Sequence, residues 1–256
     1  MIDPRAVIDP AAELDTEVEV GPFAIIGPGV QIAAGARIGP HAVLKGPTTI
    51  GPRTHVYQFA SVGEAPQDKK YAGEPTRLEI GADNVIREFA TLHRGTAQDS
   101  GLTRVGDRNL LMAYTHVAHD CIIGNDTILA NAASMAGHVA IGDFAILGGF
   151  TIVHQFACIG AHAFCQMGSV VTRDVPPYVL VGGHPAEPHG INSEGLRRRG
   201  FSDDATQRLR RAYKLLYKSG LRVTEALVEM EGPQVICPEV EHLRSFVRDS
   251  RRGILR

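Results

Sequence analysis

Residues 20–50 read VGPFAIIGPGVQIAAGARIGPHAVLKGPTTI, and an aliphatic side chain stands at every sixth position of this stretch. The aliphatic positions are Val20, Ile26, Ile32, Ile38, Leu44 and Ile50. An α-helix repeats its buried face about every 3.6 residues and a β-strand every second residue, so a period of six belongs to neither element alone. A short fixed period is typical of a solenoid built from stacked repeats.

The repeat extends well beyond this stretch. The aliphatic series runs from Ile2 to Val62, resumes at Ile80 and, after a slip of one residue, continues from Val105 to Val171. A small or β-branched residue precedes most of these aliphatics by two positions, which places both side chains on one face of a short strand. Three sides of six residues make a coil of 18. The sequence therefore predicts a parallel β-helix of triangular section.

Two polar segments interrupt the repeat, and we expect both to be loops that leave the coil. Residues 63–77 and 94–104 contain many charged, glycine or proline residues. Binding groups often concentrate in loops that a rigid scaffold holds in place. The repeat stops near Val171, so we divide the chain into a β-helical domain, residues 1–184, and a C-terminal helical domain, residues 185–256. The helical domain should cap the open end of the solenoid.

Helix signals mark the C-terminal part. Ser202 precedes two aspartates and predicts the N-cap of a helix over residues 203–219, which Gly220 ends. Two shorter helices are expected near Thr224 and over residues 238–251.

Charge is divided unevenly along the chain. From residue 191 onward there are 14 basic and 9 acidic side chains, whereas residues 1–190 hold 12 basic and 19 acidic ones. A basic C-terminal part suits an acidic partner or a phosphate-bearing substrate, and equally a plain solvated helix surface. The basic run at residues 197–199 is too short to indicate nucleic-acid binding.

Targeting and redox signals are sparse. The first residues lack the basic and apolar regions of a signal peptide, and no apolar run approaches the ~18 residues of a membrane span. We therefore expect a cytoplasmic protein without a membrane span. The four cysteines are far apart, which predicts neither a zinc knuckle nor a disulfide framework. Cys121 and Cys165 take interior positions of the repeat and should be buried.

Residues 115–121 read THVAHDC, with two histidines and an aspartate in close succession. Because residues 18 apart stack on adjacent coils, His119 should lie over Gly137, and Asp120 over His138. The register predicts one patch near a corner of the prism, formed by His119, Asp120, Gly137, His138, His154 and Gln155. Three other histidines fall outside the patch and are expected on the surface: His41, His55 and His162.

This patch has the groups that acyl transfer to a hydroxyl requires. A neutral imidazole suits general-base catalysis near pH 7, and a carboxylate beside it can fix its tautomer. Asp120 is placed to do this for His119 or for His138. Gly137 has no side chain, so its N–H can approach an oxyanion closely.

Two other classes stay open at this point. A zinc-dependent hydratase, similar to the hexapeptide-repeat carbonic anhydrases, would use the histidines as metal ligands. The spacing from His116 to His119 is three residues rather than that family's five, and no convincing third ligand appears, so we expect no metal. A non-catalytic β-helical scaffold would carry the histidines as surface residues, but it would not account for the two loops.

Eight short strings extend this interpretation over nearly the whole chain. They are YQFASVGE (57–64), KYAGEPTR (70–77), HRGT (93–96), HVAHDC (116–121), AGHV (136–139), VHQF (153–156), DVPPYV (174–179) and GLRRRGFS (195–202). With these strings the chain resembles the hexapeptide-repeat transferases, and among them the UDP-N-acetylglucosamine acyltransferase family. The resemblance implies a left-handed parallel β-helix, a homotrimer with active sites between subunits, and no cofactor.

The same resemblance implies a reaction. An (R)-3-hydroxyacyl chain would pass from acyl carrier protein to the glucosamine 3-hydroxyl of UDP-N-acetylglucosamine, the first step of lipid A biosynthesis. His119 would be the general base, Asp120 and His138 its polar neighbours, and the Gly137 N–H the oxyanion donor. The residues implied in substrate binding are Asp68, Lys70, His93, His116, His154, Gln155, Asn192, Glu194, Arg198 and Arg199.

One departure bears on the length of the acyl chain. Met167 stands where some members of the family have a glycine, so the methionine should fill the end of the acyl groove. The expected donor carries about ten carbons rather than fourteen, because hydrophobic pockets discriminate between methylenes by about 1–3 kcal/mol.

Overall fold

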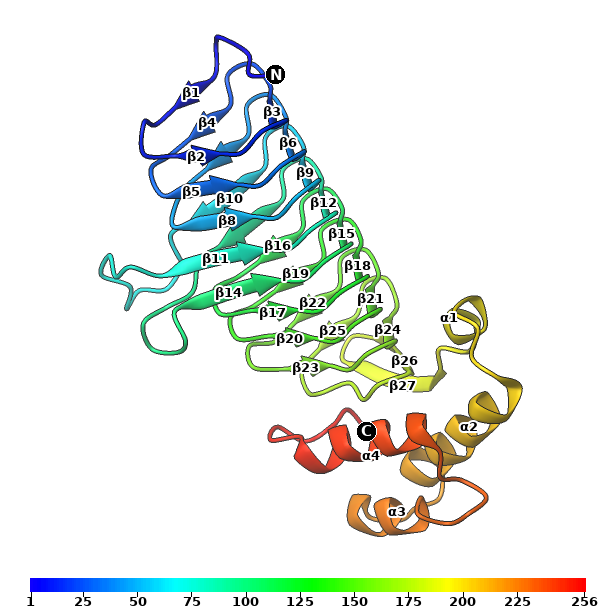
Figure 1. Cartoon of the computed structure of the whole chain (residues 1–256). Coiled ribbons are helices and arrows are strands. Elements are labelled where there is room, and N and C mark those ends of the chain that lie inside the picture. The colour runs from blue at the N-terminus through cyan, green and yellow to red at the C-terminus, as the bar shows by residue number, and fades with distance from the viewer.

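The computed structural model describes all residues, 1–256, as a stack of three-sided coils followed by four helices (Figure 1). Three sheets, of nine, eight and ten strands, form the sides of the stack, and within the stack every strand pair is parallel. The predicted fold class, a left-handed parallel β-helix with a C-terminal helical part, is confirmed.

Most strands are only two residues long, because each side of a coil is short. The nine-stranded sheet contains β1 (Val7–Ile8), β4 (Ile25–Ile26), β7 (Val43–Leu44), β10 (Ser61–Glu64), β13 (Thr91–His93), β16 (His116–Val117), β19 (Ser134–Met135), β22 (Ile152–Val153) and β25 (Val170–Val171). The eight-stranded sheet contains β2 (Glu13–Leu14), β5 (Val30–Ile32), β8 (Thr48–Ile50), β11 (Arg77–Ile80), β14 (Leu102–Val105), β17 (Ile122–Ile123), β20 (Ala140–Ile141) and β23 (Cys158–Ile159). The ten-stranded sheet contains β3 (Glu19–Val20), β6 (Arg37–Ile38), β9 (His55–Val56), β12 (Val85–Ile86), β15 (Leu110–Leu111), β18 (Ile128–Leu129), β21 (Ile146–Leu147), β24 (Phe164–Cys165), β26 (Val179–Gly183) and β27 (Ala186–Ile191).

Strand register follows the predicted coil. Ile123 pairs with Ile141, which is 18 positions later, whereas Ile80 pairs with Val105. The second interval is 25 positions, seven more than one coil, and seven is one residue more than the hexapeptide period. The loop between β13 and β14 therefore causes the slip of one residue in the aliphatic series.

The interior of the stack is filled by the two repeated positions. The aliphatic side chains, such as Leu44 and Leu111, are fully buried, and so are the small ones before them, such as Ala42. Cys121 and Cys165 are buried too, and their burial raises the pKa of each thiol to about 12. All four cysteines are free, and the two buried ones contribute to packing.

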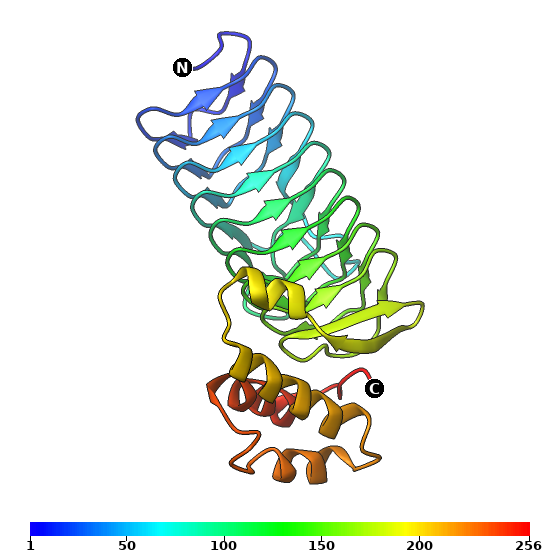
Figure 2. The same ribbon diagram turned by 90° about the vertical axis from the view of Figure 1, so that its right-hand side faces the viewer.

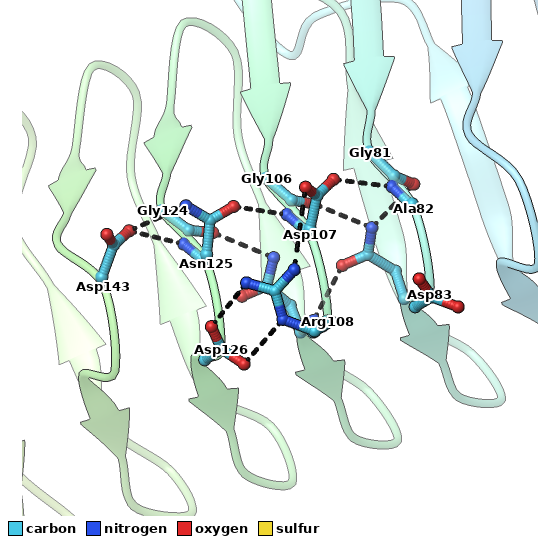
Figure 3. Close-up of polar contacts among 12 residues, drawn as sticks. Gly81, Ala82, Asp83, Gly106, Asp107, Arg108, Gly124, Asn125, Asp126 and Asp143 are labelled. Carbon is cyan, nitrogen blue, oxygen red and sulfur yellow. Dashed lines mark hydrogen bonds and ion pairs between the residues drawn. The ribbon is translucent and has the colours of Figure 1, made fainter.

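Side-chain amides and carboxylates connect the coils at the corner between the eight- and ten-stranded sheets (Figure 3). The Asp107 carboxylate accepts from the Ala82 N–H at 2.8 Å, and Asn125 Oδ1 accepts from the Asp107 N–H at 2.8 Å. Deeper in the same corner, Asn109 Oδ1 accepts from the N–H and the hydroxyl of Thr127. These bonds satisfy backbone donors that the turns would otherwise leave buried without partners.

The C-terminal part begins with an antiparallel hairpin of β26 and β27, and residues 184 and 185, where the sequence analysis divides the chain, form its turn. Four helices follow: α1 (Ser193–Arg198), α2 (Asp203–Tyr217), α3 (Val223–Glu229) and α4 (Pro238–Asp249). Ser202 caps α2 as predicted, by accepting from the Ala205 N–H, whereas α1 was not predicted.

Helices α2, α3 and α4 lie beyond the C-terminal end of the β-helix, and α1 lies beside its last coils (Figures 1 and 2). The final residues return to the β-helix, where Ile254 forms a bridge with Asp174. None of the four helices has the length and apolar content needed to cross a membrane.

Candidate active site

One corner of the prism, between the nine- and eight-stranded sheets, carries both loops and the predicted histidine patch. Residues 65–76 connect β10 to β11, and residues 94–101 connect β13 to β14. Residues 118–121 make the same connection from β16 to β17 on the next coil. The two loops leave the stack on this side (Figure 1). A single corner therefore combines the longest irregular segments of the β-helix with its densest group of histidines.

His119 and Asp120 form a buried imidazole–carboxylate pair at this corner. His119 Nδ1 lies 2.8 Å from Asp120 Oδ2, and the two residues are 8% and 5% exposed. Asp120 adopts a positive φ of 60°, as the second residue of most corner turns does. Because an ionised carboxylate only accepts, the pair places the proton on Nδ1 of the neutral imidazole. Nε2 makes no hydrogen bond within the chain and is left as the basic nitrogen.

Loop 94–101 holds the carboxylate of this pair. Asp120 Oδ1 accepts from the Thr96 N–H at 2.9 Å, and Asp120 Oδ2 accepts from the Thr96 hydroxyl at 2.7 Å. The Asp120 N–H donates in turn to the Thr103 hydroxyl. Thr96 was not among the predicted site residues, although its place in the HRGT string was a signal for it.

Gly137 lies directly against the His119 ring, as the 18-residue register predicts. A Cβ built on Gly137 would lie 2.4 Å from Cε1 of His119 and 2.7 Å from Nε2. No side chain other than hydrogen fits there. The Gly137 N–H donates to no acceptor in the chain, although the first residue of several other corner turns has a free N–H as well.

The His138 ring occupies the next coil of the same column. It stacks on Phe156, with ring centroids 4.5 Å apart, and meets the His119 ring edge-on at 5.1 Å. Its Nε2 lies 3.8 Å from Asp120 Oδ2, so the carboxylate bonds His119 and not His138. His138 Nδ1 instead meets the carboxylate of Asp99, at 2.8 Å.

His93 and His116 lie beside this column, nearer the N-terminus. Their rings meet edge-on at 5.1 Å, and Thr91 Oγ1 lies 2.7 Å from His116 Nδ1. Burial lowers the pKa of His93 to about 4, with the neighbouring His116 adding to the effect. Burial also lowers the pKa of His116, helped by His119. Both rings are therefore neutral at pH 7, and His93 is almost inaccessible to a ligand.

His154 and Gln155 follow on the next coil, where the C-terminal segment contacts them. Arg252 donates to the Gln155 carbonyl at 2.8 Å and lies 3.3 Å from His154 Nδ1. Asp68 and Lys70 lie on loop 65–76 at the same corner, where the Asp68 carboxylate accepts from the Lys70 N–H. No sequence signal connects Arg252 with residues almost a hundred positions earlier.

The residues predicted to hold the nucleotide lie elsewhere on the chain. Asn192, Glu194, Arg198 and Arg199 line a pocket of about 650 Å³ whose floor is the ten-stranded sheet. This sheet is the side of the prism opposite the His119 corner.

Each side chain around this pocket already has a partner in the chain. Asn192 caps α1 by accepting from the Gly195 N–H, and it donates to the His162 carbonyl. Glu194 pairs with Arg197 and Arg198, and these guanidinium groups hold the pKa of its carboxyl at about 2. Arg199 lies over the Phe144 ring, 4.1 Å from its centroid.

His162 was expected on the surface, and the structure has it half-buried. Its ring stacks between Phe144 and Tyr178, and Phe201 meets it edge-on. Burial, with Arg199 nearby, lowers its pKa to about 4, and its Nδ1 is buried without a partner. The reason is that residues 192–201 fold back over this corner, which the repeat alone does not predict.

Met167 lies at the third corner, between the ten- and nine-stranded sheets, and is 77% exposed. The structure therefore brings together the His119 column and the two loops, but it places the nucleotide residues and Met167 on other sides of the same chain.

A metal ion is a second possible occupant of the histidine column. His119, Asp120 and His138 each offer one ligand atom, and these atoms lie within 4.8 Å of one another. Asp120 Oδ2, which faces both histidines, already accepts two hydrogen bonds. A metal bound there would have to displace the Thr96 hydroxyl or the His119 N–H, so the donor set suits an oriented base better than a metal centre.

Comparison with known proteins assigns the family. A family model described as bacterial transferase hexapeptide matches residues 102–137, and one described as UDP N-acetylglucosamine O-acyltransferase, domain 2, matches residues 174–255. The acyl-(acyl-carrier-protein)–UDP-N-acetylglucosamine O-acyltransferase of Alkalilimnicola ehrlichii is 60% identical over 255 residues, which are 100% of this chain and 99% of the relative. The chain belongs to the UDP-N-acetylglucosamine O-acyltransferase family.

Solved structures of this O-acyltransferase family have the same fold. The UDP-N-acetylglucosamine O-acyltransferase of Moraxella catarrhalis is 45% identical, with a TM-score of 0.97 over 100% of this chain and 99% of that one. The UDP-N-acetylglucosamine acyltransferase of Arabidopsis is 35% identical, with a TM-score of 0.77 over 98% and 100%. The similarity spans both the β-helix and the helices, and the chain is an acyltransferase.

Proposed function

We propose that this acyltransferase moves an (R)-3-hydroxyacyl chain from acyl carrier protein to the 3-hydroxyl of UDP-N-acetylglucosamine, in the cytoplasm and as the first step of lipid A biosynthesis. The observation that carries the proposal is the buried His119–Asp120 pair with a free Nε2, in a chain 60% identical to a relative named for this donor and acceptor. His119 is the general base, and no cofactor takes part.

The reaction follows from the protonation of His119, which carries its proton on Nδ1 and leaves Nε2 free to act as a base. His119 Nε2 accepts the proton of the sugar 3-hydroxyl while that oxygen attacks the thioester carbonyl carbon. The negative charge passes to the carbonyl oxygen and then to the sulfur of the carrier, which leaves as the C–S bond breaks. The imidazolium returns the proton to the sulfur, so the base is regenerated. Asp120, held by Thr96, stabilises the imidazolium and keeps the proton on Nδ1 before the reaction.

The transient oxyanion requires a donor close to the base. The Gly137 N–H is unbonded, and the absence of a side chain lets a carbonyl oxygen approach it beside the His119 ring. A single oxyanion donor contributes about 10²–10³-fold to the rate.

A homotrimer with active sites between subunits accounts for the division of the predicted residues. The His119 corner and the pocket of Arg198 and Arg199 lie on opposite sides of one chain, so one chain cannot place both against a single substrate. A neighbouring copy that presents its ten-stranded sheet to the His119 corner would bring them together. Cyclic assembly of identical subunits produces such heterologous interfaces.

Exposed aromatic side chains support contact between copies. Phe23, His41, Phe59, Phe89 and Tyr114 form a continuous stack along the corner that also carries Met167. Tyr114 is 61% exposed, and Phe150, further along this corner, is 67% exposed. A continuous column of exposed aromatic side chains is typical of a surface that another protein covers.

The donor would meet the chain at its basic C-terminal part. Arg211 and Lys214 lie on the exposed face of α2 and Lys218 is its C-cap, all three around the apolar side chain of Leu215. Positive charge of this kind attracts an acidic carrier protein and orients it on approach.

The acyl chain would lie along the groove between two copies and end at Met167. A methionine there fills space that a longer chain needs, which favours a donor of about ten carbons. The side chain is free to occupy that groove because it is 77% exposed in the single chain.

A zinc-dependent hydratase remains the second candidate, supported by the proximity of His119, Asp120 and His138. It would bind zinc in proportion to active sites and would not act on acylated carrier protein. Elemental analysis of the active preparation separates the two functions.

His119→Ala tests the proposed reaction. Turnover of 3-hydroxydecanoyl carrier protein and UDP-N-acetylglucosamine should fall by about 10²–10⁴-fold, while the protein remains folded. His184→Ala, in the exposed turn of the β26–β27 hairpin, is the control and should keep the activity of the parent. Near-normal activity of His119→Ala would refute the role of this residue.

A further inference from the structure

Asp99 is a second carboxylate at the active-site corner, and none of the roles above uses it. Its Oδ2 lies 2.8 Å from His138 Nδ1, at the tip of loop 94–101. The same loop holds Asp120 through Thr96. The loop therefore serves two imidazole–carboxylate pairs, His119 with Asp120 and His138 with Asp99.

Packing alone does not determine which edge of the His138 ring faces the site. Phe156 stacks on the ring with an interplanar angle of 16°, and the His119 ring meets it at 88°. These contacts fix the plane of the ring, but they are almost the same after a 180° rotation about the Cβ–Cγ bond. That rotation would exchange the ring nitrogens with ring carbons. The Asp99 carboxylate is the one charged group that bonds Nδ1 and so distinguishes the two orientations.

The proton position follows from the same bond. A carboxylate accepts only, so neutral His138 carries its proton on Nδ1 and leaves the Nε2 lone pair unprotonated. Nε2 lies on the side of His119 and Asp120, 3.8 Å from Asp120 Oδ2, too far for a hydrogen bond to the carboxylate. An unprotonated nitrogen beside the base is free to accept a hydrogen bond from a substrate hydroxyl.

We propose that Asp99 is a positioning residue, which fixes the orientation and the Nδ1–H tautomer of His138 so that Nε2 accepts a hydrogen bond from a hydroxyl of the bound substrates. The proposal rests on the acyltransfer assigned above. Both substrates of that reaction carry hydroxyl groups, on the sugar and on the 3-hydroxyacyl chain. Loop 94–101 then holds both histidine side chains in place, His119 through Asp120 and His138 through Asp99.

The test compares variants of the full-length protein in steady-state acyl transfer. Asp99→Ala should lower kcat by about tenfold, since a hydrogen bond to a half-exposed carboxylate lies at the weak end of charged hydrogen bonds. Asp99→Asn should lose less, because its amide oxygen can still accept from Nδ1. Ser100→Ala is the matched control, an exposed neighbour in the same loop, and should keep the parental rate.

A second set of variants distinguishes positioning from a general effect on the loop. In a His138→Gln background, Asp99→Ala should have no further effect on kcat, because its role acts through the missing ring. In ¹⁵N-histidine spectra, His138 should change from the Nδ1–H tautomer to a mixture when Asp99 is replaced by alanine.

Two results would overturn the proposal: parental kcat in Asp99→Ala, or the same tenfold loss with His138 already replaced. His119→Ala, measured in parallel, shows whether the proposed reaction itself holds, independently of the role of Asp99. If His119→Ala is inactive while Asp99→Ala matches the parent, only the role of Asp99 is wrong.

Discussion

Gly137 is the residue whose size matters most at the active-site corner, because the His119 ring lies where a Cβ would be. Gly137→Ala should displace the imidazole and lower kcat by about 10²-fold or more, since the base must lie within hydrogen-bonding distance of the hydroxyl. The KM for the nucleotide sugar should change little, because the pocket of Arg198 and Arg199 lies elsewhere on the chain. Steady-state kinetics measure both quantities.

Gly149→Ala is the matched control for this variant. Gly149 also begins a corner turn, but its added Cβ would meet only the Asn131 carbonyl oxygen, at 3.3 Å. Equal losses in the two variants would mean that alanine disturbs corner turns in general. Parental activity in Gly137→Ala would show that the ring can move without loss of the base.

Met167 is the residue that should set the length of the acyl chain. Replacement by glycine removes the side chain from the end of the groove, and the preference should move from ten carbons toward fourteen. Competition between 3-hydroxydecanoyl and 3-hydroxytetradecanoyl carrier proteins, read by product mass, measures the change. We expect a change in the kcat/KM ratio of about 10- to 100-fold. Equal use of both donors by the parent would refute the role of Met167.

Among the elements, the coils could be predicted from sequence and the segments that leave them could not. A period of 18 placed His119 over Gly137 and Asp120 over His138, because stacked coils leave no freedom in register. It contained no information on the path of loop 94–101, and so Thr96 and Asp99 were missed. Helix α1 was missed for a related reason, since it is a single short element whose N-cap, Asn192, had been interpreted as a ligand of the nucleotide.

Side-chain amides and carboxylates hold the coils in register at the corner between the eight- and ten-stranded sheets. Asn109 is 1% exposed; its Oδ1 accepts from the Thr127 N–H, and its Nδ2 donates to the Gly124 carbonyl. Asn109→Ala leaves the buried Thr127 N–H and the half-buried Gly124 carbonyl without this hydrogen-bond partner, which should lower the free energy of unfolding by about 2 kcal/mol. Asn131→Ala, at an exposed corner turn, should leave it unchanged. Denaturant unfolding at one fixed protein concentration provides the comparison.

At the scale of the whole molecule, the division of the site between two sides of the chain makes activity a property of neighbouring copies. If each active site joins His119 of one subunit to Arg199 of the next, then His119→Ala and Arg199→Ala subunits can complement each other. Arg199 is a suitable partner, because it lies over Phe144 at the pocket on the ten-stranded sheet, away from the His119 corner. Each variant alone should be nearly inactive.

Mixed trimers give a quantitative expectation for this complementation. When the two variants are unfolded, mixed in equal amounts and refolded, about three quarters of the trimers contain both kinds of subunit. Every such trimer has one interface of three with both intact residues, so activity should reach about a quarter of the parent. Mixing the folded proteins without subunit exchange should restore none. A refolded mixture no more active than its components would show that each chain builds its active site alone, which would contradict the shared site.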